Sequence, residues 1–479
     1  MNTWVTKYLE TKGYYNISST YYNYIKIWEQ WFKNDVGFHK YYDNYGTERR
    51  MYSLGMAKRV CEDWASTIYS DRDEITTDKK NNKKYVETLK KDFKLHKEIP
   101  KCIEKTSWSG TCGAIIRVKN AKVVNGKLTA DENTTRELIK VTAKQIIPLK
   151  VEHGNIVDVA FVSDTMVGKV KAIYVELHQL LEKGYKISNI YLNAQDGTEI
   201  VNGSVLSSFE TGSKIPLFSL LFTPKENPIE DNNGLGFSVY GDAIDQLKGC
   251  DITYHNFMQD FVLGGKKLIY NKKLVKYETI INSDGTTTEI PVYPDDISKQ
   301  QFMEVGDDLD TSNDKKLIHE YNPALRVEDN KNGVQFSLDL MAFKVGLGTK
   351  YYQFNNGTVV TATQYVGDRQ DLVINAKKYR DNLSEFISGI IKAGLLIGRL
   401  VFKEKVTEDC TVLIDNVDGF MEDEESIKQS AREDLALGII SKIEYRMTVY
   451  HETEEVAKEM LAKLDEENTI KDVKIDKTK

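Results

Sequence analysis

The chain lacks the short motifs on which most phosphate, nucleic-acid and hydrolytic enzymes depend. It has no Gly-rich phosphate loop ending in Lys-Ser or Lys-Thr, no Gly-X-Ser-X-Gly and no His-Glu-X-X-His. Its histidines are isolated and none lies at ligand spacing from cysteine or aspartate. They are His39, His96, His153, His178, His255, His319 and His451. We therefore expect a protein that is not an enzyme and that has no metal site and no cofactor.

Cysteine is also scarce. The five cysteines are scattered and include no Cys-X-X-Cys pair; they are Cys61, Cys102, Cys112, Cys250 and Cys410. An odd number at irregular spacing argues against a disulfide framework. The pattern predicts reduced, mostly packed thiols, as in a cytosolic product.

Long apolar runs and a strongly basic balance are absent as well. No stretch of about 18 apolar residues occurs, so we expect no transmembrane helix. The first residues do not combine a charged segment with an apolar run, so no signal peptide is expected. The net charge of −7 argues against a protein that grips nucleic acid over its whole surface. It does not exclude one that surrounds DNA without holding it.

The clearest periodic signal lies between residues 334 and 398. Residues 334–352 read as a helix, 353–361 as a Gly/Asn/Thr loop, and 362 to about 398 as a much longer helix. Apolar residues recur in the long helix at alternating spacings of three and four; they are Leu372, Ala376, Tyr379, Leu383, Phe386 and Ile390. This pattern also fits a helical hairpin in an ordinary core.

The rest of the chain alternates between helical and β-rich segments. We expect helices over residues 51–70 and up to about 95, with a charged loop at 71–84, and short antiparallel strands between 113 and 216. A second long helix, 237–263, is stopped by Gly264-Gly265, and a small β-rich unit follows at 266–326. Beyond Pro323 there is no proline, and the pattern is helical apart from a strand pair near 400–412.

Two charged clusters each allow two interpretations. An acidic run could hold a divalent cation, but acidic residues before a helix also stabilise its N-terminus, and we favour this interpretation. It comprises Asp415, Asp418, Glu422, Asp423, Glu424 and Glu425. A basic cluster could contact DNA or could be a solvated strand edge that lysine protects from aggregation. It comprises Lys266, Lys267, Lys272, Lys273 and Lys276.

Several segments, in order, resemble the portal proteins of tailed bacteriophages, in particular those of long-tailed phages of Gram-positive bacteria. They are residues 53–58 (SLGMAK), 108–114 (WSGTCGA), 176–178 (ELH) with 184–189 (GYKISN), 227–228 (NP) with 234–240 (GLGFSVY), 361–366 (TATQYV), 414–416 (IDN), 422–425 (EDEE), 438–442 (GIISK) and 454–457 (EEVA). The chain departs from the family where Cys112 replaces a glycine or small residue. It departs again at Asn416 and Val417, where the family carries a second aspartate, which further weakens a metal site there.

The resemblance implies an α+β, portal-like fold. Residues 1–236 would form a wing or body with a helical N-terminus and a β-rich insert. A first stem helix at 237–263, a small α/β clip at 264–333 and a second stem helix at 334–352 would follow. The remaining parts would be a tunnel loop at 353–361, a long helix returning to the wing at 362–412, and a helical crown at 413–479. The tunnel loop would line a DNA channel with Gln353, Phe354, Asn355, Asn356, Gly357, Thr358 and Val359. Basic residues of the clip or facing DNA would be Lys266, Lys267, Lys272, Lys273, Lys276, Lys344 and Lys350.

The resemblance also implies a function. Members of the family form a ring, of twelve subunits in the virion, at one capsid vertex, through which the genome is packaged and ejected. The implied partners are other copies of the chain, double-stranded DNA without sequence specificity, the terminase large subunit, the major capsid and scaffolding proteins, and the head–tail adaptor, with no membrane. The protein would be made in the bacterial cytoplasm and reside in the virion. Two alternatives remain: another ring-forming or connector component of a phage, or a metal-dependent nucleic-acid enzyme that uses the acidic run at 415–425.

Overall fold

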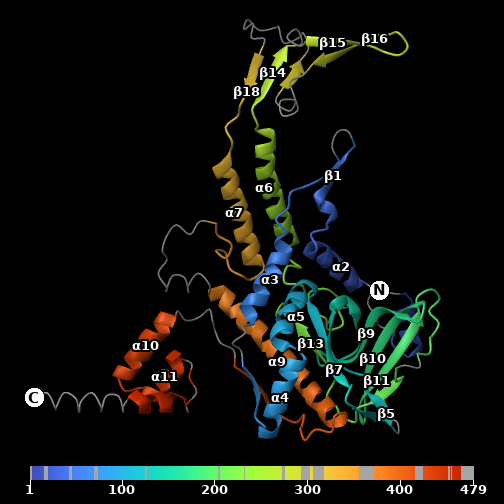
Figure 1. Cartoon of the computed structure of the whole chain (residues 1–479), viewed down its shortest axis with the longest axis vertical. Helices are drawn as coiled ribbons and strands as arrows, with labels where there is room; N and C mark the ends of the chain where they lie inside the picture. Colours follow the sequence, from blue (N-terminus) through green and yellow to red (C-terminus); the bar gives the residue numbers. More distant parts are fainter. Residues whose placement is uncertain are drawn as a thin grey trace, which may run out of the picture.

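The computed structural model describes residues 3–15, 20–42, 46–69, 74–124, 127–202, 205–230, 232–271, 276–292, 302–305, 318–354, 370–415, 424–450, 452, 454 and 456–464. Within these ranges the chain combines helices with mostly antiparallel sheets, which confirms the predicted α+β class. Figure 1 shows a body of helices and sheets from which two long helices project, with strands at their far end.

Helices fill the centre of the body. Helix α9 (Gln370–Leu400) runs along it and buries a nearly continuous face from Leu372 to Ile397, as its periodicity predicted. Around it lie α3 (Met56–Ile68), α4 (Lys80–Asp92) and α5 (Leu95–Ser109), and α2 (Thr20–Phe32) packs on α3 and α5. The sequence did not predict α5 because Pro100 lies inside it, at a position that usually argues against a helix.

Two antiparallel sheets flank these helices. The first has the order β13-β4-β7, built from Phe218–Phe222, Thr111–Lys119 and Thr135–Thr142. The second has the order β12-β11-β10-β9-β8 and consists of Ser208–Glu210, Gly184–Asn193, Val170–Leu181, Asn155–Val167 and Ile146–Glu152. A turn at His153 and Gly154 joins β8 to β9, and both residues have positive φ (51° and 82°). The antiparallel β-rich insert is thus confirmed. Helix α1 (Thr3–Thr11) buries Val5 and Leu9 against the second sheet.

Two antiparallel helices form the projecting stem in Figure 1. They are α6 (Ile244–Leu263) and α7 (Val327–Lys344), and they pack against each other. Helix α6 starts later than predicted because residues 237–243 form turns tied to the body: Val239 N donates to Ser107 O at 2.9 Å, and Tyr240 Oη donates to Trp28 O at 2.8 Å. The prediction of a helix at 237–243 was therefore wrong.

The second stem helix also differs from its predicted range of 334–352. It begins at Val327, inside the range assigned to the clip, where Arg326 and Asn330 both bond to Asp260 of α6. It ends at Lys344 because Gly346 and Gly348 take φ of 85° and 87°, which a helix cannot continue through. Residues 345–352 are consequently not helical.

The far end of the stem carries strands. They are β14 (Lys267–Asn271), β15 (Lys276–Ile281), β16 (Thr287–Val292), β17 (Phe302–Val305) and β18 (Ile318–Tyr321). A turn at Gly285 (φ 79°) joins β15 to β16. Of the predicted α/β clip, the described residues between 265 and 322 contribute strands and connecting turns.

The predicted strand pair near residues 400–412 was wrong. Residues 402–411 are irregular, and β19 (Val412–Asp415) pairs instead with β3 (Glu74–Thr77), in a stretch expected to be a loop. The irregular segment is held by long-range bonds, such as Asn82 Nδ2 to Thr407 O at 2.7 Å. The C-terminal helices α10 (Glu424–Ala436) and α11 (Lys442–Tyr450) follow as predicted. None of the helices in the described ranges has the length and hydropathy required to cross a bilayer.

Candidate functional site

The site indicated by the sequence lies where α7, the segment after it and the start of α9 meet. Of the predicted tunnel loop, the structure describes Gln353 and Phe354. The remaining predicted loop residues, Asn355, Asn356, Gly357, Thr358 and Val359, lie outside the described residues. Phe354 is 68% exposed although it is a large apolar residue. The described part of the site consists of the residues that lead into the loop.

The segment that follows α7 is folded tightly against the body. Leu347 is buried, and its amide donates to Ala342 O at 2.9 Å, which closes the end of the helix. Asn375 of α9 donates from Nδ2 to Gly346 O at 3.1 Å. Helix α9 thus holds the turn that reverses the chain after the stem.

Tyr352 attaches the end of this segment to α3. Its hydroxyl donates to Asp63 Oδ2 at 2.6 Å, and Arg59 donates to the same carboxylate from Nε at 3.0 Å and approaches Oδ1 with Nη2 at 2.9 Å. Burial, and then the negative charge of Asp63, raise the pKa of Tyr352 above its ordinary value. The phenol consequently stays protonated and remains a donor to this buried carboxylate.

Gln335 attaches the same residues to α7. Its Nε2 donates to Tyr352 O at 2.7 Å and to Asp339 Oδ1 at 2.8 Å, while its Oε1 accepts from Phe354 N at 3.4 Å. Residues 352–354 are thereby fixed by a side chain from each of two helices. We call Asp63, Gln335 and Tyr352 the loop anchor.

The predicted basic residues are not gathered in one place. Lys266 lies at the far end of α6 and pairs with Glu320 at 2.7 Å. Lys344 is at the body end of α7, where it pairs with Asp242 at 3.3 Å, and Lys350 is exposed in the following turn. Lys272 and Lys273, and the side chains of Lys267 and Lys276, lie outside the described part of the chain. The described lysines therefore do not form a single DNA-binding patch.

The acidic run is only partly described. Asp415 ends β19, and Glu424 and Glu425 begin α10, whereas Asp418, Glu422 and Asp423 fall outside the described ranges. Within those ranges there is no group of three or more His, Cys, Asp or Glu side chains that could hold a metal ion. The five cysteines are free and buried, as their spacing predicted.

A feature that the sequence prediction missed is an apolar face on α7 that points to solvent. Phe336, Leu340 and Phe343 are 65%, 46% and 59% exposed. Their spacing of three and four places them on one side of the helix, opposite the buried residues Val334 and Leu338. We call these three residues the α7 stripe. The signal was present in the sequence, since α7 carries apolar residues all round, which is typical of a helix that is covered on more than one side.

The stripe lies among acidic side chains. Glu328, Asp329 and Asp339 share the solvent-facing side of α7 with it. This combination of aromatic and acidic groups differs from the mixed charges expected on a helix that faces only water.

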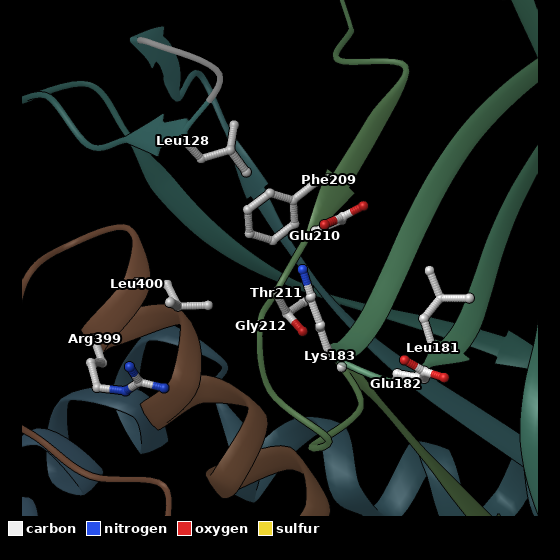
Figure 2. A pocket seen from close by; sticks show the side chains of 11 residues that line it. Leu128, Leu181, Glu182, Lys183, Phe209, Glu210, Thr211, Gly212, Arg399 and Leu400 are labelled. Atoms are coloured by element: carbon white, nitrogen blue, oxygen red, sulfur yellow. The ribbon is translucent and has the colours of Figure 1, made fainter.

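A cleft lies at the other end of α9, away from the stem. Its volume is about 780 Å³, and Figure 2 shows it between the end of α9, the β10–β11 turn and β12. Its apolar residues are Leu128, Leu181, Phe209 and Leu400, and its charged residues are Glu182, Lys183, Glu210 and Arg399. Arg399 is already paired, since its Nε donates to Glu408 Oε2 at 2.8 Å. The cleft has no nucleophile paired with a base among these residues.

Comparisons with known proteins identify no family. No family model matches the chain, and no curated protein matches it. The chain is similar to one in a solved structure described as "Neck of native GTA particle computed with C12 symmetry", with 10% sequence identity and a TM-score of 0.39. The match covers 82% of this chain and 89% of the other.

Proposed function

We propose that this chain is the subunit of a phage portal: a ring at one capsid vertex that encloses a DNA channel. The observation that carries the proposal is the stem. Helices α6 and α7 run from the body to a small group of strands and back, and α7 leads through the loop anchor towards α9. This is the order of elements implied by the resemblance in sequence, and it joins a projecting stem directly to the predicted channel loop.

The exposed apolar residues of the stem support assembly. Besides the α7 stripe, the far end of α6 exposes Phe261, Val262 and Leu263. Soluble monomers rarely leave such contiguous apolar surface in water, whereas an interface between copies would cover it. In a closed ring the two sides of each subunit differ, so each copy offers one surface to the next and another to the previous one. We propose twelve copies in the virion.

The charge balance suits a conduit for DNA. The chain carries −7, and a ring of copies multiplies that charge, so the phosphate backbone is repelled rather than bound. The loop anchor would deliver Phe354 and the neutral residues after it to the channel, where they touch DNA without trapping it. The proposed role is structural rather than enzymatic. Its partners are the terminase large subunit, the capsid and scaffolding proteins, and the head–tail adaptor.

Negative-stain electron microscopy with light scattering tests the assembly. Rings with a central hole and a mass near twelve times 54.8 kDa are the expected result. Particles that stay monomeric over a wide range of salt and protein concentration, and in the presence of scaffolding and capsid proteins, would count against the proposal.

A deletion tests the channel and distinguishes a portal from another connector ring. Removal of residues 355–359 should leave rings and capsids intact but prevent DNA packaging or retention. Normal packaged DNA in this variant would favour another ring component of the virion over a portal.

A further inference from the structure

A short β-hairpin projects beside the stem, and none of the residues in its two strands is buried in the body. Its strands are β1 (Lys40–Tyr42) and β2 (Glu48–Arg50), and Figure 1 shows it standing clear of the body next to α6. Every residue of both strands is exposed, and Tyr42 is 70% exposed. A two-stranded hairpin is marginal by itself in water, so it needs a partner surface. We call it the arm.

The base of the arm is fixed to α6 by two residues one helical turn apart. Asp251 accepts from Leu54 N at 2.8 Å and contacts His39 Nε2 at 2.8 Å, and both Asp251 and His39 are buried. His255 accepts from Tyr52 N at 3.2 Å through Nδ1, and its ring lies against Tyr52 and Tyr41, with centroids 5.9 and 6.1 Å away. Burial lowers the pKa of His255, which favours the neutral ring that this bond requires. The arm is thus held at a defined place while its two strands remain exposed to solvent.

Helix α7 packs on the other side of α6. Thr253 Oγ1 lies 3.4 Å from Ser337 Oγ, and Asp260 accepts from Arg326 Nη2 at 2.6 Å. Thr253 and Asp260 are on a side of α6 different from that of Asp251 and His255, by the geometry of 3.6 residues per turn. Helix α6 therefore separates the arm from α7. A chain cannot cover its own α7 stripe with its own arm without unpacking the stem.

The arm and the α7 stripe complement each other in chemistry. In the described strands of the arm, Lys40 pairs with Glu48 at 3.2 Å, and Arg49 and Arg50 add two further positive charges. Arg50 also donates to Asn34 O at the base of the arm. The strands also expose the tyrosine rings of residues 41 and 42. The α7 stripe offers aromatic and aliphatic surface bordered by three carboxylates, those of Glu328, Asp329 and Asp339. Aromatic residues and arginine are the types most enriched where proteins bind each other.

We propose that the arm of one copy of this chain docks on the α7 stripe of the neighbouring copy. The contact is heterologous: each copy gives its arm to one neighbour and its stripe to the other, which is the requirement for a ring that closes head to tail. The inference rests on the proposed ring, and it names the two surfaces that make the contact. The charges bring the copies into register, and the aromatic groups supply the apolar area.

Cross-linking between two singly substituted chains tests this contact. Glu48→Cys places a thiol on the arm, and Asn332→Cys places one beside the stripe; both positions are exposed, and the native cysteines are buried. The two chains, carrying different tags, are co-assembled into rings and treated with a short bis-maleimide. A mixed covalent dimer is expected. The control partner is Val201→Cys, at a 92% exposed position on the wing, and with Glu48→Cys it should give no mixed dimer.

Charge reversal tests the same contact independently through the fraction of protein found in rings. Misfolding would not give the expected result, because a misfolded chain would not recover rings when the two pairs of substitutions are combined. Arg49→Glu with Arg50→Glu on the arm, or Glu328→Lys with Asp329→Lys on α7, should each lower the fraction of protein in rings about tenfold, because like charges then face each other. The chain with all four substitutions should recover rings, as measured by mass photometry.

The outcomes separate the two proposals. Rings that give no mixed dimer with Asn332→Cys, or a fourfold variant that assembles no better than the double variants, would overturn the arm contact and leave the ring in place. Absence of rings in the unsubstituted chain would overturn both.

Discussion

Replacing Tyr352 with phenylalanine should loosen the segment that leads into the predicted channel loop without unfolding the body. The change removes one hydroxyl, which donates to Asp63 Oδ2 at 2.6 Å, and leaves the ring in place. A hydrogen bond to a buried charged group contributes about 1.5–3 kcal/mol. Because Arg59 continues to donate to the carboxylate, we expect a loss of about 2 kcal/mol, towards the lower part of that range.

Hydrogen exchange of the backbone amides of residues 345–354 is the suitable assay, since it reports local opening rather than global unfolding. A loss of about 2 kcal/mol corresponds to a fall in protection of about thirtyfold. Amides of the distant strands β9 and β10 should keep their protection. Tyr15→Phe, at a 75% exposed position, is the matched control and should change neither region.

A double-mutant cycle with Asp63→Ala shows whether the effect travels through the pair. If Tyr352 acts by donating to Asp63, its replacement should cost much less once the carboxylate is gone. Equal losses in both backgrounds, or a fall in protection no larger than that of the control, would refute the assignment of Asp63 and Tyr352 as a loop anchor.

Three further predictions concern the body. Burial alone would raise the pKa of Glu176, but His178 and Arg117 hold this pKa below its ordinary value. The ionised carboxylate of Glu176 therefore stabilises the fold above the unfolded-state pKa. This stabilisation is lost as pH falls through the folded-state pKa. Glu176→Gln should accordingly lower the melting temperature at neutral pH and flatten its decline in acid, and an unchanged acid profile would contradict this. Gly110→Ala should destabilise the chain by several kcal/mol or prevent soluble expression, because Gly110 has φ of 80° and an added Cβ would collide with the backbone of Gly236. The five native thiols should resist a thiol reagent in the native state and all react in denaturant, and rapid native labelling would disprove their burial.

The elements that the sequence predicted well are those whose pattern is local. Strands β8 to β11 are rich in apolar and β-branched residues and are joined by tight turns, so composition and the hairpin residues agree. Helix α9 was predicted because its apolar face recurs over many turns. By contrast, β3 and β19 pair across more than three hundred residues, and four-residue strands give no periodic signal that could reveal such a partner. The end of α7 was misplaced because its apolar spacing continues past Gly346, where the backbone turns away.

Predicting the site from sequence was limited in the same way. Tyr352 and Asp63 are 289 residues apart, and a tyrosine and an aspartate are too common for their pairing to be read from composition. The apolar residues of the α7 stripe were visible in the sequence, but which of them face solvent depends on how α7 packs against α6 and the body. Lys266 and Lys344 were both assigned to the clip or to a surface facing DNA, whereas they lie at opposite ends of the stem.

Helix α9 gives the subunit a mechanical property. Its 31 residues correspond to a rod of about 46 Å at 1.5 Å per residue. One end holds the turn after α7 through Asn375, and the other end supplies Arg399 and Leu400 to the cleft shown in Figure 2. Because the rod is packed along nearly its whole length, a displacement at one end moves the other end instead of being absorbed by bending. The distance between the turn that follows the stem and the cleft on the far side of the body is therefore set by one rigid helix.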